Sequence, residues 1–274
     1  MTDKRITSLF FDLDGTLLDD AKSIDPELIA YLWDLKQRRG LRLGFATGRH
    51  EVSVSPIIER FQLDGLLDFM VCNNGADLYY FDTGEHITNG YIPVETLDHC
   101  LSLFGKYDFI ASAFHNDGHK LIANRYTKAV EGVLTRNAYN KFYYPNETDY
   151  CPASKFLVLF DPADFDRVDA AVKANPVDGL RSVRTEDDIY ELISLENSKA
   201  AGTAKVLARY GWTMENVMFF GDAENDRQMM EHSGISVCMA NGKDFIKPIA
   251  DFITSKSNNE NGIQDFLETH EFLL

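Results

Sequence analysis

The chain is organised around Ile6-Thr7-Ser8-Leu9-Phe10-Phe11-Asp12-Leu13-Asp14-Gly15-Thr16-Leu17-Leu18. The mostly apolar first part, which ends at a glycine, predicts a strand that is buried on both faces. Asp12 and Asp14 follow where this strand should stop, and their spacing of two places them on the same side of an extended chain. Ligands of open α/β sheets bind at the carboxyl ends of parallel strands. Two like charges this close need a metal ion, a shared proton or both.

The bulk properties are those of a globular protein with a sizeable core and limit its partners. The 274 residues suffice for one large domain or two ordinary ones. The formal net charge of −16 argues against nucleic acid and anionic membrane surfaces as partners. An anionic substrate of this chain therefore needs local positive charge in order to bind.

The cysteines and the N-terminus favour a cytoplasmic protein. Cys72, Cys100, Cys151 and Cys238 are far apart and form no CxxC pair, which disfavours a zinc site or a disulfide framework. Scattered thiols are typical of a reducing cytosol. The first apolar run is too short for a signal peptide, and no stretch approaches the roughly 18 apolar residues of a membrane span.

Strand and helix patterns alternate at both ends of the chain. Asp25-Pro26 and Gly40 delimit a predicted helix, and apolar runs at 41–46, 69–72, 217–220 and 235–239 predict strands. This alternation predicts an α/β fold with a doubly wound parallel sheet. From about residue 82 the pattern changes to hairpin strands and helices, including a hairpin around 115–119, which predicts an inserted α+β module. We expect a discontinuous core, 1–82 and 190–274, with an insertion at 83–189.

Two further segments can bind an anion. Thr47-Gly48-Arg49 follows a predicted strand, and its hydroxyl and backbone N–H groups can hold a phosphate oxygen. The alternative role of Thr47 is a structural helix cap. Lys199 begins the helix after the insertion, where an ammonium group suits an anion site. Its alternative is a solvated surface lysine, and Lys205 is the competing candidate, about 240° away around the helix.

A second acidic cluster, Gly221-Asp222-Ala223-Glu224-Asn225-Asp226, ends another apolar strand. Capping of the next helix explains Glu224 or Asp226, but less easily the whole cluster. His115 and His119 have the spacing of a zinc pair, but Asn116-Asp117-Gly118 breaks any helix between them, so a metal site there is disfavoured.

Taken in order, these four motifs resemble the DxDxT, Thr, Lys and GDxxND pattern of the haloacid dehalogenase-like phosphatase superfamily. Further matches resemble its Cof-type subfamily, the subfamily IIB sugar phosphatases: Phe45-Ala46-Thr47-Gly48-Arg49, Asn74-Gly75-Ala76, Val237-Cys238-Met239 and the tail 258–262. The resemblance implies a Rossmann-like core with an inserted C2-type cap. It also implies an enzyme, a phosphoric monoester hydrolase that acts on small phosphorylated metabolites, with sugar phosphates as the best candidates.

The resemblance also implies roles for single residues. Asp12 resembles the nucleophile that forms an aspartyl-phosphate, and Asp14 the general acid and base. Mg²⁺ would be held by the Asp12 carboxylate, the Asp14 main-chain carbonyl and Asp222, with Asp226 in support. The phosphoryl oxygens would be bound by Thr47, Lys199, Asn225 and the backbone N–H groups of Leu13 and Gly48.

Two alternatives remain open at this point. One is phosphoryl transfer to a second sugar, as in hexose phosphate mutases of similar architecture. The other is a regulatory protein that keeps the fold without turnover, against which the intact set of Asp12, Asp14, Lys199 and Asp222 argues. His115, Asp117 and Arg125 of the insertion are candidate substrate contacts. The sequence leaves the substrate and the oligomeric state undetermined.

Overall fold

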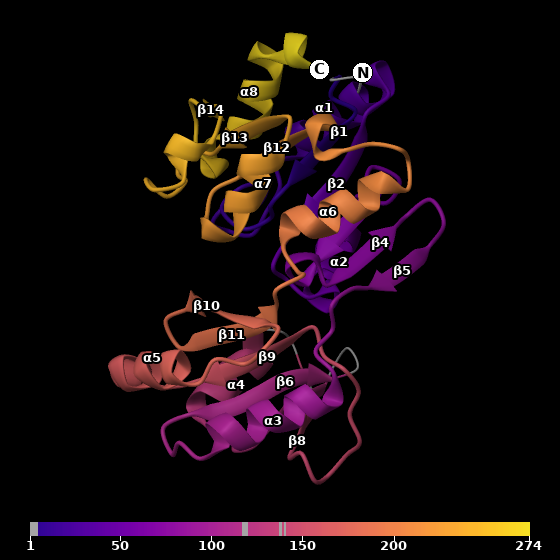
Figure 1. Ribbon diagram of the computed structural model, residues 1–274. Helices are drawn as coiled ribbons and strands as arrows, with labels where there is room; N and C mark the ends of the chain where they lie inside the picture. Colours follow the sequence, from indigo (N-terminus) through magenta and orange to yellow (C-terminus); the bar gives the residue numbers. More distant parts are fainter. Residues whose placement is uncertain (1–4, 117–119, 137–138, 140) are drawn as a thin grey trace. The chain divides into compact units, whose positions relative to one another are not determined.

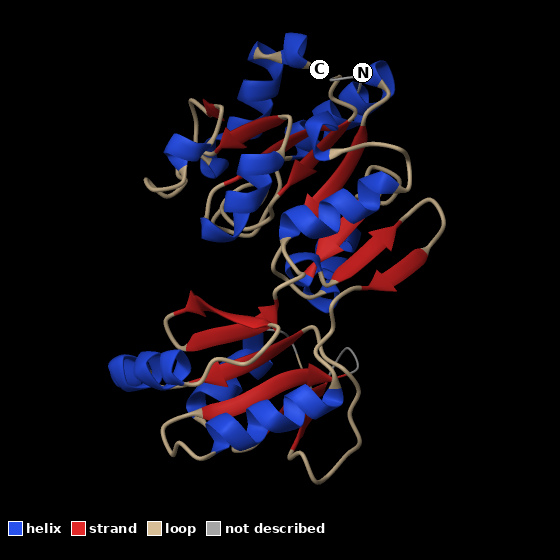
Figure 2. Cartoon of the chain, viewed as in Figure 1, coloured by secondary structure: helices blue, strands red, loops and turns tan. Residues whose placement is uncertain are grey.

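The computed structural model describes residues 5–116, 120–136, 139 and 141–274, which form two compact units. The first unit joins Met1–Asn89 to Ser198–Leu274, and the second is Gly90–Asn197 (Figure 1). Each unit contains its own sheet with helices packed on it (Figure 2).

The sheet of the first unit is parallel over most of its width. Its strand order is β14-β13-β12-β1-β2-β3-β4-β5. The strands are β1 (Ser8–Phe11), β2 (Arg42–Ala46), β3 (Phe69–Cys72), β4 (Asp77–Tyr80), β5 (Glu85–Thr88), β12 (Val217–Gly221), β13 (Ile235–Cys238) and β14 (Phe252–Ile253). Only the β3–β4 and β4–β5 pairs among these described strands are antiparallel.

Helices cover both faces of this sheet. Leu9 and Phe11 of β1 pack with α1 (Pro26–Arg39), α2 (Glu51–Arg60) and α8 (Gly262–Thr269). Phe10 points to the opposite face and packs with α6 (Lys199–Ala208) and α7 (Arg227–His232). The predicted doubly wound α/β core is confirmed.

The limits of α1 follow from the residues at its two ends. The Asp25 carboxylate accepts a hydrogen bond of 2.8 Å from the Glu27 N–H group, and Pro26 is the first helical residue. At the other end Gly40 adopts a left-handed conformation with φ of 67°, which terminates the helix. The predicted helix at 25–40 therefore forms with nearly the expected bounds.

The sheet of the second unit is mostly antiparallel, in the order β10-β11-β9-β6-β7-β8. Helices α3 (Val94–Gly105) and α5 (Phe165–Ala174) pack on one face, and α4 (Lys128–Arg136) on the other. The strands are β6 (Ala111–Asn116), β7 (Lys120–Ala123), β8 (Lys141–Tyr143), β9 (Lys155–Leu159), β10 (Leu180–Glu186) and β11 (Ile189–Ser194). Strands β6 and β7 pair antiparallel as predicted, while the turn at 117–119 lies outside the described residues.

Short 3₁₀ turns complete the described elements. Those of the first unit are Asn73–Gly75, Met214–Asn216, Glu224–Asp226, Lys247–Ile249, Asn258–Glu260 and Glu271–Leu273, and Pro162–Asp164 lies in the second unit. The helix expected after the acidic cluster 221–226 therefore begins as the 3₁₀ turn Glu224–Asp226 and continues as α7.

The boundaries of the insertion differ from the predicted 83–189, because strand pairing decides to which unit a segment belongs. Strand β5 follows residue 82 but pairs with β4, so it belongs to the first unit. Strand β11 pairs with β10 and with β9 (Lys155–Leu159), so it belongs to the second unit. The boundaries consequently lie at 89/90 and 197/198 instead of 82/83 and 189/190.

None of the helices in the described part of the chain is long and apolar enough to span a membrane.

Candidate active site

Three neighbouring parallel strands of the first unit end in polar residues. Strand β1 lies between β12 and β2 and pairs in parallel with both. Asp12 follows β1, Thr47 follows β2 and Asp222 follows β12. Since parallel strands place their carboxyl ends along one edge of a sheet, this topology brings residues from three distant segments together.

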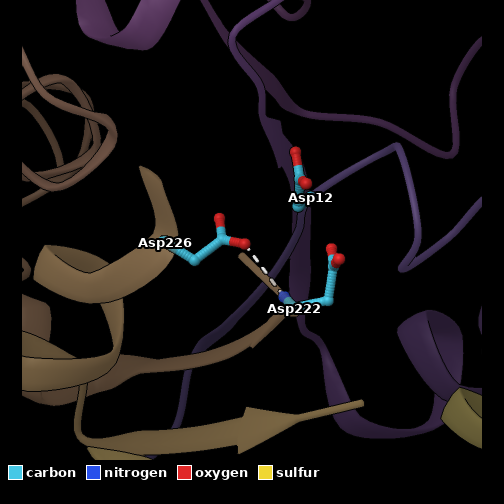
Figure 3. A group of neighbouring side chains, drawn as sticks. All are labelled: Asp12, Asp222 and Asp226. Carbon is cyan, nitrogen blue, oxygen red and sulfur yellow. Dashed lines mark hydrogen bonds between the residues drawn. The ribbon is translucent and has the colours of Figure 1, made fainter. Parts of the chain in front are cut away.

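Three buried carboxylates gather at this edge. Asp12, Asp222 and Asp226 each offer one oxygen, and these oxygens lie within 4.8 Å of one another (Figure 3). Burial raises the pKa of Asp222 to about 6, and the nearby charge of Asp226 adds to the increase. Burial also raises the pKa of Asp12, despite the opposing attraction of Lys199. A group of buried carboxylates is stabilised by cations, and hard oxygen ligands suit a divalent ion such as Mg²⁺.

Lys199 supplies one cation from the first turn of α6. Its ammonium group is fully buried and lies 2.8 Å from Asp12 Oδ1 and 2.7 Å from Asp226 Oδ1. Burial by itself lowers the pKa of Lys199, but the two carboxylates outweigh this effect and raise it above the usual range. Lys205 lies elsewhere and donates to Asn89. The structure thus places Lys199, and not Lys205, beside the carboxylates.

Asp226 is held by the protein through both of its oxygens. Oδ2 accepts from the backbone N–H group of Asp222 at 2.9 Å (Figure 3). It also accepts from the N–H group of Ala223 at 3.0 Å, and Oδ1 accepts from Lys199 at 2.7 Å. These bonds fix the loop that carries Asp222. The geometry therefore fits the supporting role predicted for Asp226 better than that of a principal metal ligand.

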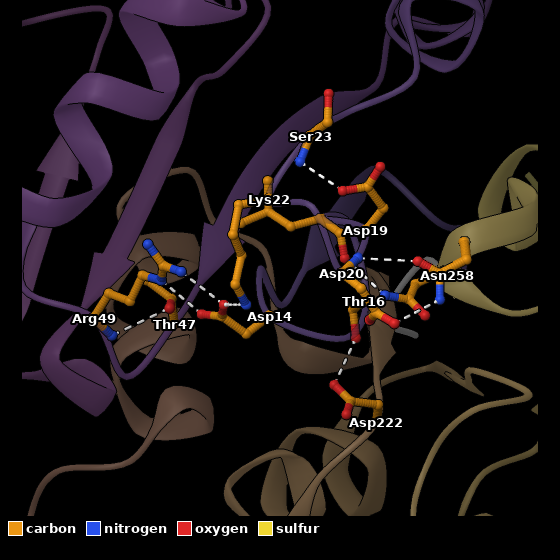
Figure 4. A network of polar contacts seen from close by, with 12 residues as sticks. Asp14, Thr16, Asp19, Asp20, Lys22, Ser23, Thr47, Arg49, Asp222 and Asn258 are labelled. Carbon is orange, nitrogen blue, oxygen red and sulfur yellow. Dashed lines mark hydrogen bonds and ion pairs between the residues drawn. The ribbon is translucent and has the colours of Figure 1, made fainter. Parts of the chain in front are cut away.

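Thr16 orients Asp222 through a hydrogen bond that the sequence pattern did not predict. Its hydroxyl group donates to Asp222 Oδ1 at 2.9 Å (Figure 4). Gly15 precedes it with φ of 76°, and a Cβ atom there would lie 2.6 Å from Asp222 Oδ2. The glycine therefore permits both the left-handed turn and the close approach of Asp222. The threonine of the DxDxT pattern was the available signal for this contact.

Asp14 contacts two cations, Arg49 and Lys22, which the sequence pattern did not predict as its partners. Arg49 donates to both carboxylate oxygens of Asp14 at 2.6 Å, and Lys22 donates to Oδ1 at 2.7 Å (Figure 4). Burial raises the pKa of Asp14, but these cations outweigh it and lower the pKa to about 2. The position of Arg49 directly after Thr47-Gly48 could have predicted that it lies at the site. No local sequence signal predicts the same for Lys22.

The predicted phosphate-binding groups lie around the same strand ends. Thr47 is buried and accepts the Arg49 N–H group at 3.2 Å, while His50 caps α2, so Thr47 is not the cap of that helix. A Cβ atom on Gly48 would lie 3.2 Å from Asn74 Oδ1 and 3.6 Å from Asn225 Nδ2. Gly48 and Asn225 are therefore neighbours, together with Asn74.

The remaining candidates are Leu13 of the first unit and residues of the second unit, two of which lie outside the described residues. Leu13 is buried between Asp12 and Asp14, and its carbonyl accepts the Leu18 N–H group at 2.8 Å. His115 and Arg125 belong to the second unit, where Arg125 donates to the Gly105 and Asp108 carbonyls. Asp117 and His119 lie outside the described residues.

Comparison with known proteins gives matches over most of the chain. A family model described as haloacid dehalogenase-like hydrolase matches residues 9–267. The HMP-PP phosphatase of Klebsiella pneumoniae is 27% identical over 86% of this chain and 85% of its own length. The pyridoxal phosphate phosphatase YbhA of Escherichia coli is 26% identical over 94% of this chain and 96% of its own length.

Solved structures show the same fold. A haloacid dehalogenase-like hydrolase from Bacteroides thetaiotaomicron superposes with a TM-score of 0.80 at 24% identity, covering 97% of this chain and 100% of that one. A subclass IIB sugar phosphatase superposes with a TM-score of 0.79 at 22% identity, covering 98% and 100%.

Proposed function

Because the chain belongs to the haloacid dehalogenase-like hydrolase family, we propose that it hydrolyses phosphate monoesters of small metabolites through an aspartyl-phosphate. Sugar phosphates are the foremost substrate candidates. The resemblance drawn from the four motifs is confirmed at the level of the family, and the relatives named above are phosphatases. In this proposal the inserted unit Gly90–Asn197 acts as a cap, which the resemblance implies would select the leaving group of the substrate.

One observation carries the proposal: the buried Asp12 carboxylate lies at the end of β1, 2.8 Å from the Lys199 ammonium group and next to Asp222. A nucleophilic carboxylate must be ionised, and burial disfavours ionisation. Lys199 opposes this effect and can also hold a phosphoryl oxygen. The same ammonium group can therefore keep the nucleophile ionised and stabilise the anionic phosphoryl group that the nucleophile attacks.

The first step of the proposed reaction is in-line attack. A carboxylate oxygen of Asp12 bonds to phosphorus while the bond from phosphorus to the leaving oxygen breaks. Asp14, which has taken up a proton after leaving Arg49 and Lys22, gives that proton to the leaving oxygen, and the alcohol departs. Asp14 then takes a proton from water, which attacks phosphorus, releases inorganic phosphate and restores Asp12.

Lys199, Thr47, Asn225 and the N–H groups of Leu13 and Gly48 bind the phosphoryl oxygens in this scheme. Their contribution is to stabilise the charge of the transferring group, which is the main catalytic requirement of phosphoryl transfer. The acid role of Asp14 requires this residue to separate from Arg49 and Lys22, which occupy both of its oxygens in this structure.

The residues also fit Mg²⁺. The Asp12 and Asp222 carboxylates and the Asp14 main-chain carbonyl would hold the ion, and Thr16 and Asp226 would orient the loop around Asp222. When bound, Mg²⁺ supplies positive charge that offsets repulsion between the acidic groups and a phosphate dianion.

The test is release of inorganic phosphate from a panel of phosphate monoesters, measured with Mg²⁺ and again with a chelator. We expect turnover of several small esters with Mg²⁺ and loss of turnover with the chelator. The variant Asp12→Asn should reduce kcat by about 10⁴-fold or more, because it removes the nucleophile. An added acceptor sugar tests the alternative of phosphoryl transfer, which would yield a new sugar phosphate.

Asp34→Asn is the matched control, because Asp34 is an exposed aspartate of α1 that pairs with Arg38. It should retain wild-type turnover and stability. Substantial activity in Asp12→Asn would disprove the nucleophile assignment. Absence of phosphate release from the whole panel would favour the non-catalytic alternative.

A further inference from the structure

The ion pairs of Asp14 with Arg49 and Lys22 join three segments of the first unit. Asp14 follows β1, Lys22 belongs to the loop before α1, and Arg49 follows β2. The Arg49 guanidinium donates two hydrogen bonds of 2.6 Å, one to each oxygen of the Asp14 carboxylate, and Lys22 donates a third of 2.7 Å (Figure 4). Both oxygens of the proposed acid are therefore engaged by cations.

These two cations differ from Lys199 in their accessibility. The Lys199 side chain is 0% exposed, whereas Arg49 is 27% and Lys22 56% exposed. Solvent, and hence a ligand, can reach Arg49 and Lys22. Lys199 is shared between two buried carboxylates, while Arg49 and Lys22 share a single carboxylate that is itself 41% exposed.

The backbone holds both cations in place. Lys22 has a left-handed φ of 59°, a conformation that is unfavourable for a residue other than glycine. Its turn is closed by the Lys22 N–H bond to the Asp19 carbonyl and by the Ser23 N–H bond to the Asp19 side chain. The Arg49 N–H group donates to Thr47, and its carbonyl accepts from the Asn73 N–H group. Strained backbone that surrounding bonds maintain is typical of functional sites.

The reaction geometry brings a substrate close to these cations. An acid must lie about 2.6–3.2 Å from the oxygen that it protonates. Arg49 lies 2.6 Å from the carboxylate of that acid, so the groups next to the leaving oxygen come near its guanidinium. A guanidinium fork binds a carboxylate or phosphate through two parallel hydrogen bonds. In a chain with a net charge of −16, a second anionic group on the substrate requires such a partner.

We propose that Arg49, assisted by Lys22, determines specificity by exchanging its ion pair with Asp14 for a second anionic group on the substrate. The preferred substrates are then phosphate monoesters whose leaving group carries a carboxylate or another phosphate close to the ester oxygen. The exchange frees Asp14 for the leaving oxygen at the moment when such a substrate binds. This inference rests on the proposed phosphatase function and narrows its substrate class.

The experiment compares matched esters, 3-phosphoglycerate and glycerol 3-phosphate, which differ by a carboxylate in place of a hydroxymethyl group. In wild type, kcat/KM should be about tenfold higher for 3-phosphoglycerate, as expected for charged hydrogen bonds at a partly exposed site. Arg49→Met should abolish this preference mainly through KM, Arg49→Lys should retain part of it, and Lys22→Met should weaken it. Arg38→Met is the control, because Arg38 of α1 pairs with Asp34 of the same helix and with Glu271 near the C-terminus.

A binding measurement separates this inference from the proposed function. In the Asp12→Asn background, calorimetric titration with Mg²⁺ present should show tighter binding of 3-phosphoglycerate than of glycerol 3-phosphate, and added Arg49→Met should remove the difference. Equal affinities for the two esters would overturn the inference, whether or not wild type hydrolyses them. An equal loss for both esters in Arg49→Met would also overturn it, because Arg49 would then only position Asp14. Absence of phosphate release by wild type would contradict the proposed function instead.

Discussion

Lys199 is the residue that offsets the negative charge of the buried carboxylates. Its ammonium group is 0% exposed and is shared by Asp12 and Asp226, with Asp222 close by. A buried ion pair contributes little net stability, because desolvation of the charges offsets their attraction. Removal of one member, however, leaves a buried charge without compensation. The cost of losing Lys199 should accordingly exceed that of losing a surface lysine.

Lys199→Met tests this expectation at the residue scale. With a chelator present, so that no divalent ion compensates, its free energy of unfolding should fall by about 3–5 kcal/mol. Lys205→Met removes an exposed lysine of the same helix that bonds to Asn89. This variant should change the free energy of unfolding by about 0.5 kcal/mol or less. Urea denaturation measures both. Equal losses in the two variants would show that the buried ammonium group has no special role.

At the scale of elements, the 3₁₀ turn Asn73–Gly75 joins the loop after β2, which carries Thr47, to the start of α6. The Asn73 and Asn74 N–H groups donate to the Arg49 and Thr47 carbonyls at 2.9 and 3.0 Å. Gly75 packs so closely on α6 that a Cβ atom there would lie 2.2 Å from the Ser198 carbonyl oxygen. The turn therefore sets the distance between the segment that carries Thr47 and the helix that carries Lys199.

Gly75→Ala should displace the first turn of α6 and lower kcat about 10²-fold, because small displacements of catalytic groups are costly. Gly84→Ala is a matched control: Gly84 also has a positive φ, of 68°, but a Cβ atom there meets nothing within 4 Å. Gly84→Ala should lose about 1 kcal/mol of stability from backbone strain, and Gly75→Ala should lose more, because its Cβ atom also clashes with the backbone of Ser198. Steady-state kinetics and thermal unfolding distinguish the two variants. A similar kcat for both would refute the idea that the turn sets the distance between Thr47 and Lys199.

At the scale of the whole molecule, the chain forms two units with separate apolar cores. In the first unit the core residues lie on the two faces of the parallel sheet. In the second they lie between the antiparallel sheet and α3, α4 and α5. A unit with its own core can in principle fold alone.

Residues 90–197, expressed alone, should therefore unfold cooperatively on heating, as followed by circular dichroism. The segment 83–189, which the sequence pattern predicted as the insertion, should show no cooperative transition. It lacks nearly all of β11, which joins β10 to β9 in the sheet. Cooperative unfolding of 83–189 with the stability of 90–197 would mean that β11 is dispensable and that the boundaries are misplaced.

The α/β core and the candidate residues could be predicted without coordinates: the candidates are Asp12, Asp14, Lys199, Asp222 and Asp226. Apolar runs predict buried strands, and polar residues at the ends of parallel strands must meet at one edge of the sheet. These are local signals combined with a topological rule, so they needed no coordinates. The catalytic and metal-binding roles given to these residues remain predictions.

The contacts between side chains and strands that are far apart in the sequence could be known only from the folded chain. Arg49 and Lys22 meet at Asp14, and Thr16 meets Asp222, because packing brings separate loops together. Strands β5 and β11 were placed in the wrong units because a strand belongs to the sheet with which it pairs, and pairing partners are not encoded locally. Local sequence specifies backbone conformation and burial, whereas contacts between distant segments arise only when the whole chain has folded.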